Sequence, residues 1–201
     1  VIGRGAAAYL DRLIQTRKPH SIGVGWGATL RETMQHMTPA NEPRIDVRSM
    51  MGGLTHGSEI NTFEIVRGFA EVLKAQCHYF VAPIYAETPQ SREAVIAQSV
   101  FRRTFRQICD VDISYLSAGD MSQHSLQVRY GLPEGTKVSD LIALGAVGDL
   151  LGRYIDAEGN PVDHPLHLLL AADQHPEMLH RLDIVELDEA GAGGTAGRIA
   201  R

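Results

Sequence analysis

Residues 21–34 read SIGVGWGATLRETM, a short apolar run that passes through alternating glycines into a helical pattern. We expect residues 21–26 to form a buried strand and residues 28–37 to form a helix. Gly25 and Gly27 remove side chains from the turn between these elements, so the backbone can approach a ligand closely or adopt positive φ angles. In an open parallel sheet, ligands bind beyond the carboxyl ends of the strands, which is where this turn would lie.

The start of the helix that follows this turn suits an anionic ligand. Unpaired N–H groups and a partial positive charge at a helix N-terminus favour phosphate or carboxylate, and Thr29 adds a hydroxyl next to Ala28. The stretch is not the GxGxxG fingerprint, because Leu30 occupies the place of the third glycine, and it lacks the lysine of a P-loop. A tight turn without a ligand remains the alternative interpretation.

Short apolar runs and helical segments alternate along the first 119 residues. The periodicity predicts helices at 2–16, 28–37, 60–75 and 91–108, and strands at 21–26, 44–50, 77–86 and 111–119. Such alternation is typical of parallel strands joined by right-handed crossovers, with helices on both faces. The sequence therefore predicts an α/β fold, a three-layer α/β/α Rossmann-like sheet that is mostly parallel.

The pattern loosens after residue 120. We expect a turn at residues 133–135, a capped stretch from Ser139 and a strand over residues 148–156. The final residues, DEAGAGGTAGRIAR, are small and glycine-rich, so they form either a loop that faces a ligand or a poorly ordered end. A chain of 201 residues fits one domain with a sizeable core, and we treat residues 1–201 as a single domain.

Small or acidic residues recur where other strands are expected to end. They are Gly52, Gly53, Gly119, Asp120, Gly148 and Asp149. Any one of these glycines could simply form a turn, but several strand ends of this kind could converge on one crevice. Asp149 could then accept hydrogen bonds from sugar hydroxyls or, alternatively, cap a helix or a turn.

Composition and motifs exclude several classes of function. The net charge is −5, so the basic face typical of nucleic-acid binding is not expected. The basic residues are scattered apart from Arg102, Arg103 and Arg106, for which we favour a solvated helix face over a local basic patch. We see no signal peptide and no apolar run of about 18 residues that could span a membrane, so we expect a cytoplasmic protein. The nine histidines lack zinc-ligand spacing, and we expect neither metal nor cofactor.

Four segments together resemble the sugar-binding domain of SorC/DeoR-type bacterial transcriptional regulators. They are IGRGAAAYLDRLI, SIGVGWGATLRETM, the run from MMGGLTHG to APIYA, and LGAVGDLLGRYIDAEGNPV, and the resemblance covers about residues 3–162. It implies a fold similar to phosphosugar isomerases, glucosamine-6-phosphate deaminases and CoA transferases. It also implies a sugar or phosphosugar effector that is not turned over, and a homodimer or homotetramer. A helix-turn-helix domain that binds operator DNA is expected upstream and is absent from this chain.

The same resemblance implies which residues bind the effector. They are Gly25, Gly27, Ala28, Thr29, Gly52, Gly53, Asn61, Gly119, Asp120, Gly148, Asp149, Gly193 and Gly194. The tail departs from the family pattern, because it carries no lysine after these last glycines and Arg198 lies one position away from the expected place. Either an unphosphorylated sugar or an incomplete chain would account for this difference.

We therefore expect the effector-binding domain of a sugar-responsive regulator, which acts because the ligand shifts the population of its conformations. A phosphosugar isomerase or deaminase on the same fold is the main alternative, since fold alone does not settle function. The three lysines, Lys18, Lys74 and Lys137, do not follow expected strand ends, which counts against Schiff-base chemistry. A purely structural oligomerisation module is a third possibility, against which the glycine-rich strand ends count.

Overall fold

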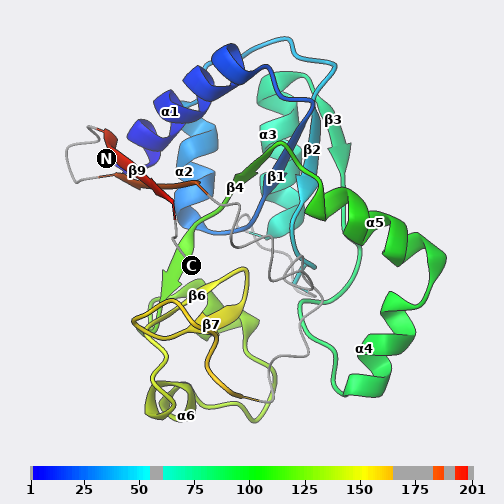
Figure 1. The fold of residues 1–201 in the computed structure, drawn as a ribbon, viewed down its shortest axis with the longest axis vertical. Helices are drawn as coiled ribbons and strands as arrows, with labels where there is room; N and C mark the ends of the chain where they lie inside the picture. Colours follow the sequence, from blue (N-terminus) through cyan, green and yellow to red (C-terminus); the bar gives the residue numbers. More distant parts are fainter. Residues whose placement is uncertain (1, 55–60, 165–182, 188–192, 199–201) are drawn as a thin grey trace.

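A four-stranded parallel sheet lies at the centre of the chain (Figure 1). The computed structural model describes residues 2–54, 61–164, 183–187 and 193–198, and for the last two ranges the backbone only. The strands lie in the order β3-β2-β1-β4. Their bounds are β1 Ser21–Val24, β2 Asp46–Ser49, β3 Gln76–His78 and β4 Ile113–Tyr115. The predicted parallel sheet is confirmed.

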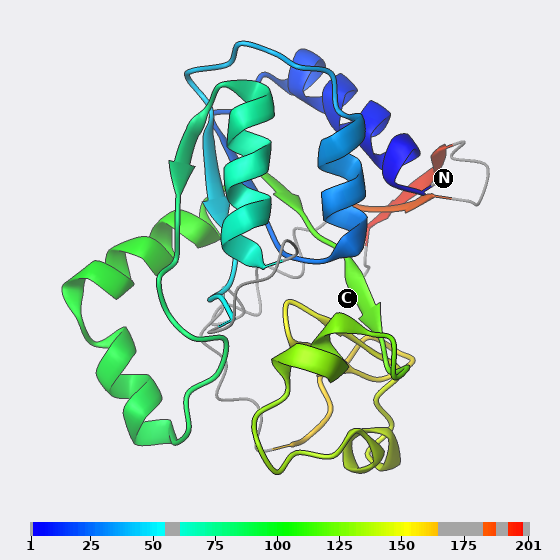
Figure 2. The ribbon, with the colours of Figure 1, turned by 180° about the vertical axis from the view of Figure 1, so that it is seen from behind.

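Helices cover both faces of this sheet, as the alternating pattern predicted (Figures 1 and 2). On one face lie α1 (Ile2–Arg17), α2 (Ala28–His36) and α3 (Thr62–Leu73), and their apolar side chains share a buried core with Ile22 and Val47 of the sheet. On the other face lies α5 (Ser99–Cys109). Its apolar side chains pack against residues of the loops that follow the strands of the sheet. The result is a three-layer α/β/α arrangement.

The predicted helix at residues 91–108 is in fact two helices, α4 (Pro89–Ile96) and α5. Gln98 takes an extended conformation between them, with φ −70° and ψ 138°. The break redirects the chain so that Phe105 and Ile108 are buried, whereas α4 buries no residue. Val100, in the first turn of α5, is 61% exposed.

Two predicted strands are also divided or shortened. The prediction for residues 77–86 holds only for β3, which ends at His78. The prediction for residues 111–119 covers two strands in different sheets, β4 and β5 (Ala118–Asp120). Gly119 and Asp120 therefore do not close a strand of the parallel sheet but lie within β5, because the chain leaves that sheet after Tyr115.

A separate, small antiparallel sheet, with the strand order β5-β6-β7, lies below the parallel sheet in Figure 1. The expected strand at residues 148–156 is the hairpin of β6 (Gly148–Leu150) and β7 (Arg153–Ile155). Its two-residue turn has positive φ angles at Leu151 (55°) and Gly152 (83°). Two-residue hairpin turns of this type require positive φ at both positions, and leucine rarely adopts it.

The rest of the chain from residue 120 onward adds two short helices and a hairpin. Gln127–Gly131 (η1) is a π-helix, and α6 runs from Val138 to Ala143, close to the capped stretch predicted from Ser139. β8 (Asp183–Leu187) pairs antiparallel with β9 (Gly193–Arg198). The glycine-rich tail was expected to be a loop or a poorly ordered end, but residues 193–198 are a strand. Among the described residues, no helix is long and apolar enough to cross a membrane.

Candidate functional site

The loop after β1 has the helix-start geometry that the sequence predicted. Gly27 has a φ of 120° and is the residue before α2, and no side chain caps the N-terminus of that helix. Ala28 and Thr29 are exposed in the first helical turn. Gly25 is buried, and a methyl group there would lie 3.3 Å from a methyl carbon of Leu151. The exposed first turn of α2 is therefore open to a ligand, whereas Gly25 packs against the β6–β7 turn.

The predicted residues after β2 lie together, and their contacts fold the loop. Gly52 packs against backbone, since a methyl group there would lie 2.3 Å from the Pro83 carbonyl oxygen. Thr62 Oγ1 donates a hydrogen bond of 3.2 Å to the Gly52 carbonyl oxygen. The buried side chain of Asn61 donates to the Leu54 carbonyl oxygen at 3.1 Å.

Gly53, the other glycine of this loop, follows the same pattern. Its N–H donates to the carbonyl oxygen of Ala82 at 2.9 Å. The residues after β2 thus shape the carboxyl edge of the sheet mainly through contacts with their own chain.

Gly119, Gly148 and Asp149 meet in the antiparallel sheet. Gly119 pairs with Asp149 across β5 and β6, and a methyl group on Gly119 would lie 2.2 Å from Asp149 Oδ1. A methyl group on Gly148 would lie 2.5 Å from the carbonyl oxygen of Gly119. Gly119 therefore leaves the space that the Asp149 carboxyl group occupies, while Gly148 allows the backbones of β5 and β6 to approach closely.

Asp149 is the buried acid of this site, with 4% of its surface exposed. Burial raises the pKa of Asp149 to about 6, which a hydrogen bond from the Gly152 N–H partly opposes and the charge of Asp120 reinforces. The Gly152 N–H donates to Oδ2 at 2.9 Å, so Asp149 also caps the β6–β7 turn, as the alternative interpretation held. A desolvated carboxyl group of this kind is common at functional sites.

Asp120 has a different setting from Asp149. It is exposed, and its Oδ1 accepts a 2.7 Å hydrogen bond from the N–H of Ser122. Hydrogen bonds from Ser122 hold the pKa of Asp120 below its ordinary value. The charge of Asp120 thus contributes to the raised pKa of Asp149, while its carboxylate stabilises a local turn through the hydrogen bond from Ser122.

Direct contacts join the β1 loop to the antiparallel sheet. Ser117 Oγ donates a 3.0 Å hydrogen bond to the carbonyl oxygen of Trp26, and a methyl group on Gly27 would lie 3.2 Å from the same Oγ. Leu151, in the β6–β7 turn, is buried in one apolar cluster with Trp26. The exposed start of α2 and the buried Asp149 are therefore parts of one region, joined through Trp26, Ser117 and Leu151.

Gly193 and Gly194 do not lie in a loop beside this region. They begin β9, and Gly193 pairs with Leu187 of β8. Figure 1 shows β9 beside α1 and α2.

Sequence reasoning missed three polar residues near Asp149, namely Tyr85, Gln127 and Tyr154. Gln127 and Tyr154 are buried, with 2% and 3% exposed surface. Tyr154 lies directly opposite Asp149 in the β6–β7 pairing. The alternation of the hairpin could have placed Tyr154, but Gln127 is oriented by the π-helix, for which the sequence carries no simple periodic signal.

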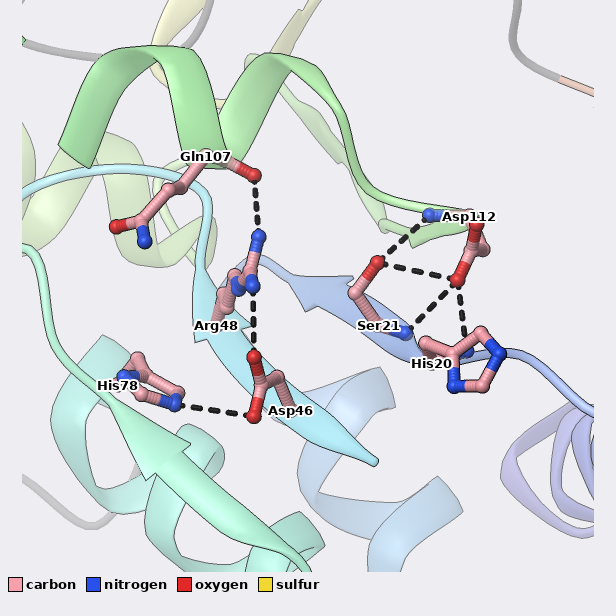
Figure 3. Close-up of polar contacts among 7 residues, drawn as sticks. All are labelled: His20, Ser21, Asp46, Arg48, His78, Gln107 and Asp112. Atoms are coloured by element: carbon pink, nitrogen blue, oxygen red, sulfur yellow. Dashed lines mark hydrogen bonds and ion pairs between the residues drawn. The ribbon is translucent and has the colours of Figure 1, made fainter. Parts of the chain in front are cut away.

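A second polar cluster lies toward the amino end of the parallel strands and next to α5 (Figure 3). Asp112 Oδ2 accepts hydrogen bonds from the N–H groups of His20 and Ser21 at 2.7 and 2.9 Å. Asp46 contacts the Arg48 guanidinium at 2.7 Å and His78 at 3.2 Å.

The charges of this second cluster are paired with one another. Burial raises the pKa of Asp46, but hydrogen bonds from Arg48 and His78 outweigh it and leave that pKa below its ordinary value. Arg48 also donates to the Gln107 carbonyl oxygen at 2.8 Å and so ties the sheet to α5. These contacts indicate a structural role. In the described parts of the chain, no group of three or more His, Cys, Asp or Glu residues could hold a metal ion.

The fold and this region define an α/β domain in which loops at the carboxyl edge of a parallel sheet face a small antiparallel sheet. The family model described as "Putative sugar-binding domain" matches residues 1–178. The chain therefore belongs to this family of sugar-binding domains, the type found in SorC/DeoR transcriptional regulators.

Named relatives support the assignment to this family, and their sequences are longer than the part that this chain matches. An erythritol catabolism regulatory protein of Brucella abortus is 26% identical over 158 residues, and a deoxyribonucleoside regulator of Bacillus subtilis is 27% identical over 161 residues. Each match covers 79% of this chain and 50% of the relative, so the chain spans about half the length of these relatives. The full-length sorbitol operon regulator of Klebsiella pneumoniae has the same fold, with a TM-score of 0.76 at 22% identity, covering 90% of this chain and 58% of that one.

Proposed function

We propose that this domain binds a sugar or phosphosugar effector between the β1 loop and the antiparallel sheet. The observation that carries this proposal is the juxtaposition of two complementary features, the exposed, side-chain-uncapped start of α2 and the buried carboxyl group of Asp149. A helix N-terminus attracts phosphate or hydroxyl oxygens, and a carboxylate accepts hydrogen bonds from hydroxyl groups.

Each part of the region has a role in this proposal. Ala28 and Thr29 offer backbone N–H groups and a hydroxyl to one end of the effector. Asp149 accepts hydrogen bonds from hydroxyls at the other end. Asn61, Gly52 and Gly53 hold the β2 loop in the shape that borders the site. Gly119 keeps the space beside Asp149 free of a side chain, and Gly148 allows β5 and β6 to lie close together.

We further propose that the domain senses the effector and does not convert it. The relatives are named as regulators, which supports this function. Effector binding would shift the population of domain arrangements in a cytoplasmic homodimer or homotetramer. A DNA-binding domain elsewhere in the full protein would read that shift at the operator.

The direct test is a thermal-shift panel of erythritol, sorbitol, 2-deoxyribose and their phosphate esters. A compound present at about 100 times its Kd stabilises a protein by about 2.7 kcal/mol, which is readily measured. Asp149→Ala and Thr29→Trp should abolish that shift and leave the fold intact by circular dichroism. Normal binding by both variants would show that the effector lies elsewhere. Conversion of a bound compound, followed by NMR, would make the protein an enzyme.

A further inference from the structure

A buried polar cluster, formed by Tyr85, Gln127 and Tyr154, lies next to Asp149. Tyr154 faces Asp149 across the β6–β7 hairpin, and directly opposed residues of antiparallel strands point to the same face of a sheet. Tyr85 OH donates a 2.7 Å hydrogen bond to the Gly152 carbonyl oxygen, while the Gly152 N–H binds Asp149. The cluster and the proposed effector acid thus share the same turn.

Two polar atoms of this cluster have no partner within the described parts of the chain. Gln127 Nε2 donates to Tyr85 OH, but Gln127 Oε1 and Tyr154 OH are buried without a hydrogen bond. Burial raises the pKa of Tyr154 to about 12, an effect that the neighbouring Gln127 and Tyr85 side chains partly oppose. Tyr154 is therefore a neutral hydroxyl, able both to donate and to accept. Leaving such groups unpaired away from water lowers stability.

The π-helix η1 and its last residue, Gly131, determine where the Gln127 side chain lies. Gln127 begins the π-helix η1, and a methyl group on Gly131, the last residue of that helix, would lie 2.4 Å from Gln127 Oε1. The glycine therefore leaves room for the amide group. Single π turns occur often at functional sites.

The charges around the cluster restrict the chemistry of its ligand. Asp149 lies beside it and the charge of Asp120 acts on Asp149, so an anion would be repelled. A neutral hydroxyl group, in contrast, can donate to Gln127 Oε1 or to Asp149 and accept from Tyr154. Any phosphate of the same molecule would be directed to the N-terminus of α2.

We propose that Gln127 and Tyr154, with Asp149, recognise neighbouring hydroxyl groups at the uncharged end of a polyol or sugar effector. This inference rests on the proposed function and adds two specificity-determining residues to it. The ligand hydroxyls supply the hydrogen bonds that the buried amide oxygen and phenol lack among the described residues.

The test uses Tyr154→Phe, which removes only the hydroxyl, and Tyr115→Phe as a matched control. Tyr115 is partly buried, and its OH, unlike that of Tyr154, donates a 2.7 Å hydrogen bond, to the Ala6 carbonyl oxygen. Affinities are measured by calorimetry for whichever of erythritol, sorbitol, 2-deoxyribose and their phosphates binds the unmodified chain. Tyr154→Phe should raise the Kd at least tenfold without lowering the unfolding midpoint. Tyr115→Phe should lower the midpoint and leave the Kd within twofold.

A second variant, Gln127→Met, keeps the approximate size of the side chain and should also raise the Kd at least tenfold. If both variants bind as the unmodified chain does, the cluster holds only a buried water and the inference is wrong, while the proposed function stands. If the unmodified chain binds no member of the panel, the proposed function and this inference fail together.

Discussion

At the scale of single residues, Gly52 shows how a predicted ligand-binding glycine can serve packing. Its α-carbon faces two backbone carbonyl oxygens, those of Ala82 and Pro83, and backbone atoms cannot move aside as a flexible side chain can. The absence of a side chain at this position is therefore required by the close approach of the residue 80–84 segment to the end of β2. The sequence located this glycine correctly at a strand end but could not show what lies against it.

Gly52→Ala should lower the free energy of unfolding by about 2 kcal/mol, because overpacking of this kind costs about 1–3 kcal/mol. Gly25→Ala is the control, since its nearest neighbours are leucine side-chain carbons at 3.3 and 3.5 Å that can shift. It should cost less than about 1 kcal/mol. Urea denaturation measures both, and equal losses would contradict the packing role of Gly52.

Asp149 should make stability depend on pH in the direction opposite to that of most carboxylates. Because burial raises its pKa to about 6 in the folded chain from an ordinary 3.8, the folded state holds a proton that the unfolded state releases. This contribution is fully present below about pH 4 and is lost as the pH rises through 6, amounting to about 3 kcal/mol at most.

Asp149→Asn removes this titration while keeping an oxygen that can accept the Gly152 N–H. The variant should be more stable than the unmodified chain at pH 8, and the difference should vanish near pH 4. Urea midpoints at intervals between these values give the curve. A difference that does not change with pH would show that Asp149 ionises with an ordinary pKa.

At the scale of elements, α4 and α5 illustrate what periodicity can and cannot predict. One helix was expected over residues 91–108, since apolar residues recur along it at helical spacing. The chain instead breaks at Gln98, without glycine or proline, and α5 buries Phe105 and Ile108 whereas α4 buries no residue. Tertiary packing thus determined a boundary for which the local sequence carries no clear signal.

Hydrogen exchange should separate α4 from α3. No residue of α4 is buried, whereas α3 buries six, so α4 should open locally at much lower free energy. Thr88 caps α4 in a reciprocal capping box with Ser91, and Thr88→Ala should speed exchange in α4 by about fivefold, equivalent to about 1 kcal/mol. The midpoint of global unfolding should remain unchanged. Equal protection of α3 and α4 would contradict this account.

At the scale of the whole molecule, the parallel sheet and its layers followed from the sequence, whereas the antiparallel sheet did not. Strict alternation of strands and helices restricts the possible topologies. The sequence therefore predicted the four strands β1 to β4, and its errors concerned mainly where each strand ends. The residues from 118 to 155 carry short strands and a hairpin turn with Leu151 at positive φ, a conformation that leucine rarely adopts. The buried position of Asp149 and its polar neighbours depends on that turn, so the sequence could name the acid but not its surroundings.

The measurement that tests the central claim most directly is a titration of the chain with the sugar, polyol and phosphate panel, followed through the fluorescence of Trp26. Trp26 is the only tryptophan of the chain and lies in the β1 loop, buried in one apolar cluster with Leu151. We predict a saturable change with at least one compound, which NMR then recovers chemically unchanged after prolonged incubation. A panel without any binding compound, or a bound compound that is converted to product, would contradict a sugar-sensing domain.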